Sequence, residues 1–242
     1  MPVYSYKTIL ACVQDALVQL NQIRPIGVYD STDGNAILMG SYANIVGDML
    51  LDSFDWQQFR GEYEVIGDGV ETDFDLPDDF NSIVDNTGWS HANRRPVIVI
   101  NAQQNAAIQA WVSKSFFINP AARIIGDKMS FVVPPALNER ITFEYLTKFW
   151  VLDEDGVTKK EELSNNGDTP MFDGTLFTIA LKIKWMQTRG MPTGSVQQEF
   201  DQRLGQVYNM NTMAGNLSLN GGSMTGFRYL NGANMPDTGY GG

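Results

Sequence analysis

Apolar residues recur at helical spacing in two segments near the start of the chain. The first segment runs from about Tyr6 to Ile23, ahead of Arg24-Pro25, and the second from about Ala36 to Ser53. Positions three or four residues apart share one face of a helix. The pattern predicts two helices, each with one apolar side turned to a core. The apolar positions are Ile9, Val13, Ala16, Leu17 and Leu20 in the first helix and Leu38, Tyr42, Ile45, Val46, Met49 and Leu50 in the second.

The middle of the chain, from about Glu62 to Leu152, has the pattern of short strands. Between Ile141 and Tyr145 apolar and polar residues alternate, which is the period of a half-buried strand. The runs Tyr63–Ile66 and Thr72–Leu76 flank Gly67-Asp68-Gly69, which predicts a hairpin. Short strands separated by turn residues indicate an antiparallel sandwich or barrel. Further strand candidates are Pro96–Ile100, Ala110–Val112, Ser115–Ile118, Arg123–Ile125, Met129–Val133 and Arg140–Val151.

Helical patterning returns after residue 172. The segment from Asp173 to Arg189 is amphipathic and stops at Gly190-Met191-Pro192, while Ser195 with Gln198 has the spacing of a capping box that opens a last helix. Helices at both chain ends therefore enclose a β insertion. We predict an α+β fold: an α-helical bundle formed by N- and C-terminal helices, with an inserted antiparallel β-sandwich or barrel domain and an extended C-terminal tail.

The predicted organisation divides the chain into five parts. They are the first part of the bundle (1–60), the β domain (61–152), an acidic linker (153–172), the second part of the bundle (173–214) and a Gly/Asn-rich docking tail (215–242). The tail holds eight Gly and four Asn but also large apolar residues, which a pure linker lacks. We expect these residues to anchor the tail on a neighbouring chain. The candidate anchors are Leu219, Met224, Phe227, Tyr229 and Leu230.

Residue counts argue against most enzyme classes. Cys12 is the only cysteine and His91 the only histidine, so neither an intrachain disulfide nor a four-ligand Cys/His zinc site can form within one chain. The sequence has no P-loop and no dinucleotide-binding glycine motif. Carboxylates are plentiful, and a glycosidase pair among them stays open as an alternative. We expect no catalytic, cofactor-binding or metal-binding residues and no membrane span.

The net charge of −11 is unevenly distributed. Nine acids and no Lys or Arg lie between Gly61 and Asn93, and seven acids lie between Asp153 and Asp173. One interpretation is a solvated acidic face that keeps the protein soluble. The other is a surface that repels a polyanion, because carboxylates oppose the approach of phosphates.

Seven sequence blocks, in this order, carry a family resemblance that extends from the first helix to about Asn211. They are Asp55-Trp56-Gln57-Gln58-Phe59, Phe74-Asp75-Leu76-Pro77-Asp78-Asp79-Phe80, Gly126-Asp127-Lys128, Val132-Val133-Pro134-Pro135, Ile141–Val151, Gly167-Asp168-Thr169-Pro170 and Gly190-Met191-Pro192. In this order the chain resembles the head-to-tail adaptor proteins of short-tailed bacteriophages. The Gly/Asn-rich tail is not part of the resemblance.

The resemblance implies a structural virion protein of the phage neck, assembled in the host cytoplasm and without enzymatic activity. Such adaptors form a ring of about twelve copies. Implied partners are the portal protein, tail nozzle, tube or fibre-attachment proteins, further copies of the chain, and double-stranded DNA that passes through the channel without specific binding. The alternatives are another neck or tail ring, such as a head-closure or tail-knob component, and a tail-associated cell-wall glycosidase. We expect some of these acids to line the channel: Glu62, Glu64, Asp68, Asp153, Glu154, Glu161 and Glu162.

Overall fold

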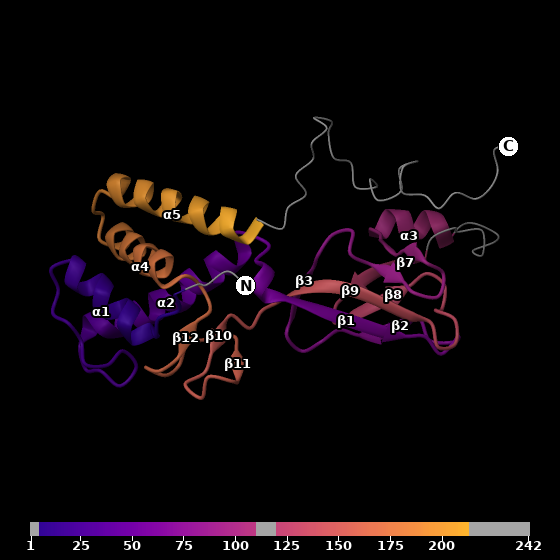
Figure 1. Ribbon diagram of the computed structural model, residues 1–242, viewed down its shortest axis with the longest axis horizontal. Coiled ribbons are helices and arrows are strands. Elements are labelled where there is room, and N and C mark those ends of the chain that lie inside the picture. The colour runs from indigo at the N-terminus through magenta and orange to yellow at the C-terminus, as the bar shows by residue number, and fades with distance from the viewer. Residues whose placement is uncertain (1–4, 110–119, 213–242) are drawn as a thin grey trace.

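The protein is described by a computed structural model that covers residues 5–109 and 120–212. Two units lie side by side along the long axis (Figure 1). We call them the helical unit (residues 5–59 and 148–212) and the β unit (residues 60–147). The predicted α+β class is confirmed, because helices and antiparallel sheets both contribute separate parts of the fold. The five candidate tail anchors, like all residues after 212, lie outside the described residues. The strand candidates at 110–112 and 115–118 also lie outside them.

The helical unit joins the two ends of the chain around one helix. Its helices are α1 (Ile9–Gln19), α2 (Gly34–Asp52), α4 (Gly174–Thr188) and α5 (Gly194–Thr212). Helix α4 packs against α1, α2 and α5. The shared core includes three fully buried tryptophans, Trp56, Trp150 and Trp185. Segments far apart in sequence therefore meet in a single apolar cluster.

The helix ends follow from local hydrogen bonds. The side chains of Thr8, Asp33 and Asp173 accept from backbone N–H groups in the first turns of α1, α2 and α4. Helix α4 ends as predicted at Gly190, which has a φ of +66° and lets the Met191 N–H bond the Met186 carbonyl.

Helix α1 is shorter than predicted because Asn21 ends it in the same way. Asn21 has a φ of +56°, and the next residue, Gln22, donates its N–H to the Leu17 carbonyl. The prediction relied on Pro25 to end the helix and overlooked that asparagine also adopts the left-handed conformation.

Residues 153–172, predicted as an acidic linker, contain strands and core residues. Strands β11 (Lys159–Lys160) and β12 (Thr169–Pro170) of this segment both pair with the preceding strand β10 (Val151–Leu152), which gives an antiparallel sheet in the order β11-β10-β12. Leu163 and Phe172 are buried in the core of the helical unit. The segment thus packs on the helices, and its acids are held in defined positions.

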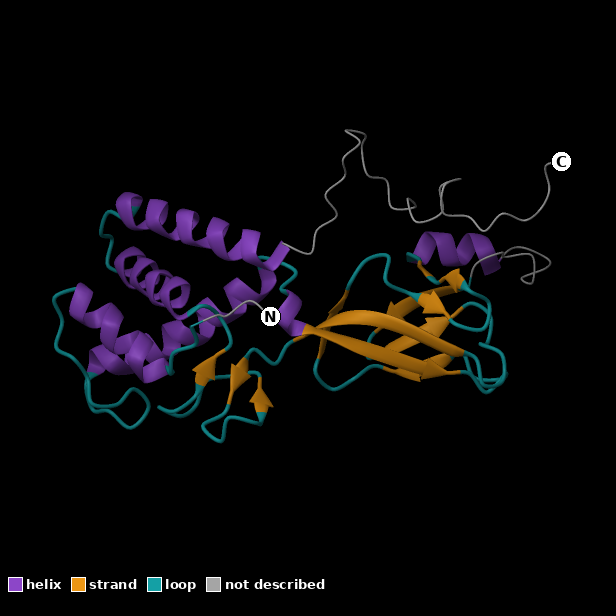
Figure 2. Ribbon diagram, in the orientation of Figure 1, coloured by secondary structure: helices purple, strands orange, loops and turns teal. Residues whose placement is uncertain are grey.

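The β unit has two sheets (Figure 2). In the first, β9 pairs with β1 on one side and with β3 and β4 on the other, and β5 pairs with β4. In the second, the order is β2-β8-β7-β6, and only the β6–β7 pair is parallel among the described strands. Both sheets contribute to one core around Phe131 and Phe143. The elements are η1 (Gln57–Phe59), which leads into the unit, β1 (Arg60–Ile66), β2 (Asp73–Asp75), β3 (Phe80–Ile83), β4 (Trp89–Ser90), β5 (Arg95–Pro96), β6 (Ile98–Val99), α3 (Ala102–Gln109), β7 (Ala121–Ile125), β8 (Lys128–Phe131) and β9 (Arg140–Thr147).

One prediction for this unit is wrong, and one alternative of another is excluded. Strands β1 and β2 do not form a hairpin, because β1 pairs along its whole length with β9 and β2 pairs with β8. The Gly67-Asp68-Gly69 turn instead carries the chain from one sheet to the other. The sheets also do not close into a barrel: within the described chain, β2 and β6 are open edges.

Two helices also differ from the predictions. Helix α3 was not predicted, because Asn and Gln dominate its sequence and leave little apolar periodicity. Helix α5 begins at Gly194, and the Gln197 N–H donates to the Thr193 carbonyl, so Ser195 lies inside the helix and does not cap it.

Candidate functional site

A charged face covers the solvent side of β1 and β9. Arg60, Glu62 and Glu64 are exposed on β1, while the alternating residues Tyr63 and Val65 are buried. Glu62 lies directly across from Glu144 on β9. Two carboxylates at such a position repel each other unless cations stand beside them.

Two arginines supply those cations. Arg140 contacts Glu64 at 2.7 Å and Glu62 at 3.6 Å, and Arg60 contacts Glu144 at 3.0 Å. The face therefore carries three acids and two bases. An open polar hollow of about 530 Å³ lies over it, lined also by Gln57 and Thr87. The sequence prediction named only the acids; the alternation along β9 puts Arg140 and Glu144 on the same face and could have revealed their partners.

Asp68 stabilises the turn after β1. Its carboxylate accepts the backbone N–H groups of Val70 at 2.8 Å and Glu71 at 2.7 Å. These hydrogen bonds favour the charged form and lower the pKa of Asp68. The side chain thus keeps its negative charge at neutral pH while it is used for local structure.

The second acidic group lies in the small sheet and is partly neutralised. The Lys160 Nζ contacts Asp153 at 2.6 Å and the fully buried Asp168 at 2.8 Å. The hydrogen bond from Lys160 lowers the pKa of Asp153. Burial by itself would lower the pKa of Lys160, but the hydrogen bonds to both carboxylates outweigh it and raise that pKa. Lys160 is thus a structural cation that links Asp153 to the buried Asp168.

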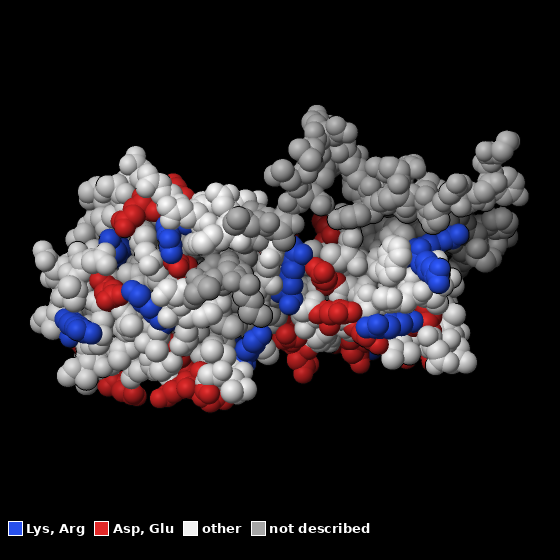
Figure 3. All heavy atoms as spheres, viewed as in Figure 1, with Lys and Arg blue, Asp and Glu red and all other residues white. Residues whose placement is uncertain are grey.

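The remaining candidates in this group are more exposed. Glu161 pairs with Lys148 at 3.1 Å. Glu154 and Glu162 are exposed, and no ion pair with the rest of the described chain involves either. The seven predicted acids therefore form two groups, one on β1 and its turn and one in the small sheet. Figure 3 shows acidic side chains along the lower edge of both units, with Lys and Arg side chains between them.

An apolar stripe on α2 is a surface that the sequence prediction placed in the core. Leu38, Ile45 and Met49 have 43%, 41% and 61% of their surface exposed. We call these three residues the α2 stripe. The buried side of the helix is instead built around small residues, and Gly47 lies so close to Trp150 that a Cβ there would be 2.0 Å from the ring. Of the six predicted core positions, Val46 and Leu50 are buried and Tyr42 packs against the core. Glycine and alanine contribute little apolar signal, so the pattern also included exposed positions beside the buried face.

The groups with potential chemistry are held in structural contacts. Cys12 is buried, and burial raises the pKa of its thiol to about 11. The buried Ser90 hydroxyl donates to Glu139 at 2.6 Å, and His91 Nε2 lies 3.2 Å from the Thr142 hydroxyl. Within residues 5–109 and 120–212 there is no cluster of three or more metal-ligating side chains. No helix in that part of the chain has the length and apolarity to cross a bilayer.

The predicted anchors of the C-terminal tail do not belong to the surfaces described above. Leu219, Met224, Phe227, Tyr229 and Leu230 all fall outside the described residues. Comparison with known families and with curated proteins gave no match for this chain. The charged faces and the α2 stripe are therefore the surfaces of the described chain that bear on its function, together with the sequence resemblance.

Proposed function

We propose that the chain is a head-to-tail adaptor: a structural virion protein that assembles on the portal as a ring of about twelve copies. The ring extends the DNA channel and provides the platform to which tail proteins attach during assembly and genome ejection. The helical unit is the bundle of the adaptor, and the two sheets of the β unit form its sandwich.

The α2 stripe is the observation that carries this proposal. The three residues of the stripe and the neighbouring Ile37 are large apolar side chains exposed on α2, although the chain has a net charge of −11. An exposed apolar patch bordered by polar residues is typical of a protein–protein contact. Contact with a different patch on the next copy would bury the stripe and, repeated, would close a ring.

Sedimentation with and without purified portal tests the proposal. We expect the protein to be mainly monomeric alone and to form a portal-bound ring when portal is present. The double variant Leu38→Glu, Ile45→Glu should lose this assembly, because it places charge in the buried contact. The matched control, Val70→Glu with Val157→Glu, changes two residues that are each 80% exposed elsewhere and should assemble normally. Assembly by both variants would contradict the role of the stripe.

The acidic faces give the ring a way to pass DNA. Carboxylates in the channel wall repel phosphates, so DNA slides without binding, and screening limits the effect to about 8 Å from the wall. Glu154 and Glu162 should act most strongly, since Glu62, Glu64 and Asp153 have cations beside them. Virions carrying Glu154→Lys and Glu162→Lys should eject their genome more slowly. Unchanged ejection kinetics would remove these residues from the channel wall.

The tail is proposed to attach the ring to the portal. Deletion of residues 215–242 should abolish binding to portal-bearing heads, and normal binding would show that the tail is dispensable. Cryo-microscopy of the virion distinguishes an adaptor from a head-closure or tail-knob ring by its position.

A further inference from the structure

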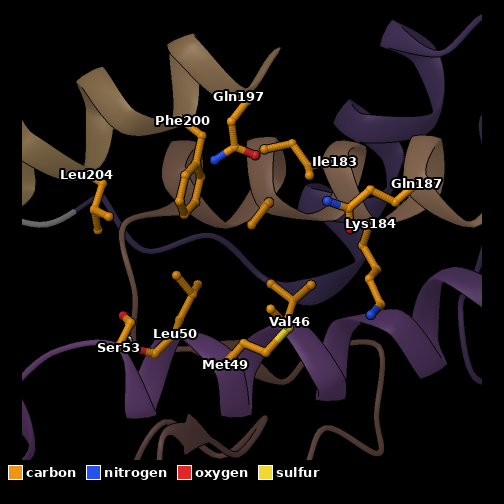
Figure 4. A pocket seen from close by; sticks show the side chains of 11 residues that line it. Val46, Met49, Leu50, Ser53, Ile183, Lys184, Gln187, Gln197, Phe200 and Leu204 are labelled. Carbon is orange, nitrogen blue, oxygen red and sulfur yellow. Dashed lines mark hydrogen bonds between the residues drawn. The ribbon is translucent and has the colours of Figure 1, made fainter. Parts of the chain in front are cut away.

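A second apolar surface lies next to the α2 stripe, between α2 and α5. Both helices pack on α4, and a groove of about 220 Å³ remains between them. Figure 4 shows Phe200 and Leu204 of α5 pointing across it toward Val46 and Leu50 of α2. Met49 lies on the same wall of the groove.

The groove has the dimensions and lining of a site for one large apolar side chain. Cavities of about 150 Å³ with aliphatic and aromatic walls take up benzene. Here the walls are Val46, Leu50, Ile183, Phe200 and Leu204, with polar side chains at the rim. Two of the rim residues, Lys184 and Gln187, can hydrogen-bond to the backbone of a bound peptide. The site therefore fits a short peptide that inserts an aromatic or aliphatic residue.

The chain itself supplies such a peptide at a suitable distance. Helix α5, which forms one wall, ends at Thr212, about 18 Å beyond Phe200 at 1.5 Å per residue. The sequence Gly226-Phe227-Arg228-Tyr229-Leu230 follows, and the fifteen residues from Thr212 to Phe227 can span up to about 50 Å. A tether of this length keeps the peptide at an effective concentration of about millimolar. A partner in solution must compete with that concentration.

We propose that in the unassembled protein the groove between α2 and α5 binds residues 226–230 of its own chain, with the Phe227 side chain inserted between Leu50 and Phe200. The proposal does not depend on the ring role, because it concerns the isolated chain. It defines an intramolecular contact that any partner of the C-terminal segment must displace.

Disulfide trapping in the full-length protein tests this contact. In the double variant Met49→Cys, Gly226→Cys, mild oxidation at low protein concentration should give an intrachain disulfide, identified by peptide mapping. The matched control is Leu38→Cys, Gly226→Cys, because Leu38 is exposed on the same helix but about 16 Å away. We expect trapping at position 49 to be at least about tenfold faster, as a local contact raises the effective concentration.

Two further variants separate a bound tail from a freely diffusing one. Adding Phe227→Ala to the trapping variant should reduce its rate to that of the control, whereas adding Tyr240→Ala should leave it unchanged. Equal rates at positions 38 and 49, or no effect of Phe227→Ala, would overturn the proposal. Disulfide-linked dimers in place of intrachain products would assign the groove to the tail of a second copy and would also overturn it.

Discussion

Arginine–carboxylate pairs of the helical unit and the β unit differ in how deeply the carboxylate is buried. In the helical unit, Arg203 forms a two-point contact with Asp173, which is 3% exposed, with Nε–Oδ1 and Nη2–Oδ2 distances of 3.0 and 2.8 Å. In the β unit, Arg60 and Glu144 meet on the open face of a sheet, with 34% and 48% of their side-chain surface exposed. The same type of ion pair is therefore structural in one unit and a surface feature in the other.

The buried pair of the helical unit links two of its helices. Asp173 caps α4 through the Leu176 N–H, and Arg203 links that cap to α5. Loss of Arg203 would leave a buried carboxylate without its cation. The β unit relies on cross-strand neighbours, and its surface charges remain available for contacts outside the molecule. The helical unit thus holds a buried carboxylate paired with a cation, while the β unit presents its pair of Arg60 and Glu144 on an exposed face.

The largest predicted effect comes from breaking the buried pair. Arg203→Met should lower the free energy of unfolding by about 3 kcal/mol, because it leaves Asp173 buried and uncompensated. The matched change Arg60→Met in the β unit should cost less than about 1 kcal/mol. Urea denaturation of both variants measures the contrast. Equal losses would mean that burial does not distinguish the two pairs.

A smaller effect is expected from the glycine that brings α2 against Trp150. Gly47→Ala places a methyl group against the buried indole and should destabilise the protein by about 1–3 kcal/mol. Gly205→Ala on α5 adds the same group where no atom lies within 4 Å and should stabilise by about 0.5–1 kcal/mol. Thermal unfolding should therefore shift in opposite directions. A shift in the same direction would contradict the packing of Trp150 on α2.

The smallest effect concerns acid sensitivity. The pKa of Asp153 is lower in the folded chain than its ordinary value, so its pairing stabilises the protein above about pH 4 and is lost as the pH falls further. Asp153→Asn should be less stable than the wild type at pH 7 and should lose less stability between pH 4 and pH 3. Denaturation midpoints measured across this range give the slope of stability against pH. A slope equal to that of the wild type would show that Asp153 does not contribute.

The turn in the β unit provides a comparison for this measurement. Asp68 also has a lowered pKa, but its partners are backbone N–H groups of Val70 and Glu71. Asp68→Asn should also reduce the dependence of stability on pH between pH 4 and pH 3, because the charged form of Asp68 stabilises its turn. The contact between Lys160 and Asp168 should not change. If only Asp153→Asn changed the slope, acid sensitivity would be confined to the helical unit.

Local periodicity was sufficient to identify most of the regular elements. The alternation from Ile141 to Tyr145 marked β9, and Gly190 marked the end of α4, because a strand's period and a helix stop depend on neighbouring residues alone. The net charge of −11 and its two acidic clusters were also fixed by the sequence, as was the lack of a second cysteine or histidine. The C-terminal anchors remain a sequence prediction.

Only the tertiary structure decided which partners these elements have. Strand β1 pairs with β9 and not with its neighbour β2, because pairing depends on the core shared by strands about 80 residues apart. The tertiary structure also decided which acids have no cation beside them, because it brings Arg140 to Glu64 and Lys160 to Asp153. The face of α2 was set in the same way: Trp150 needs the space above Gly47, and this leaves Leu38, Ile45 and Met49 at the surface. Periodicity records apolar positions along a chain, whereas burial depends on which distant side chain fills the space beside each of them.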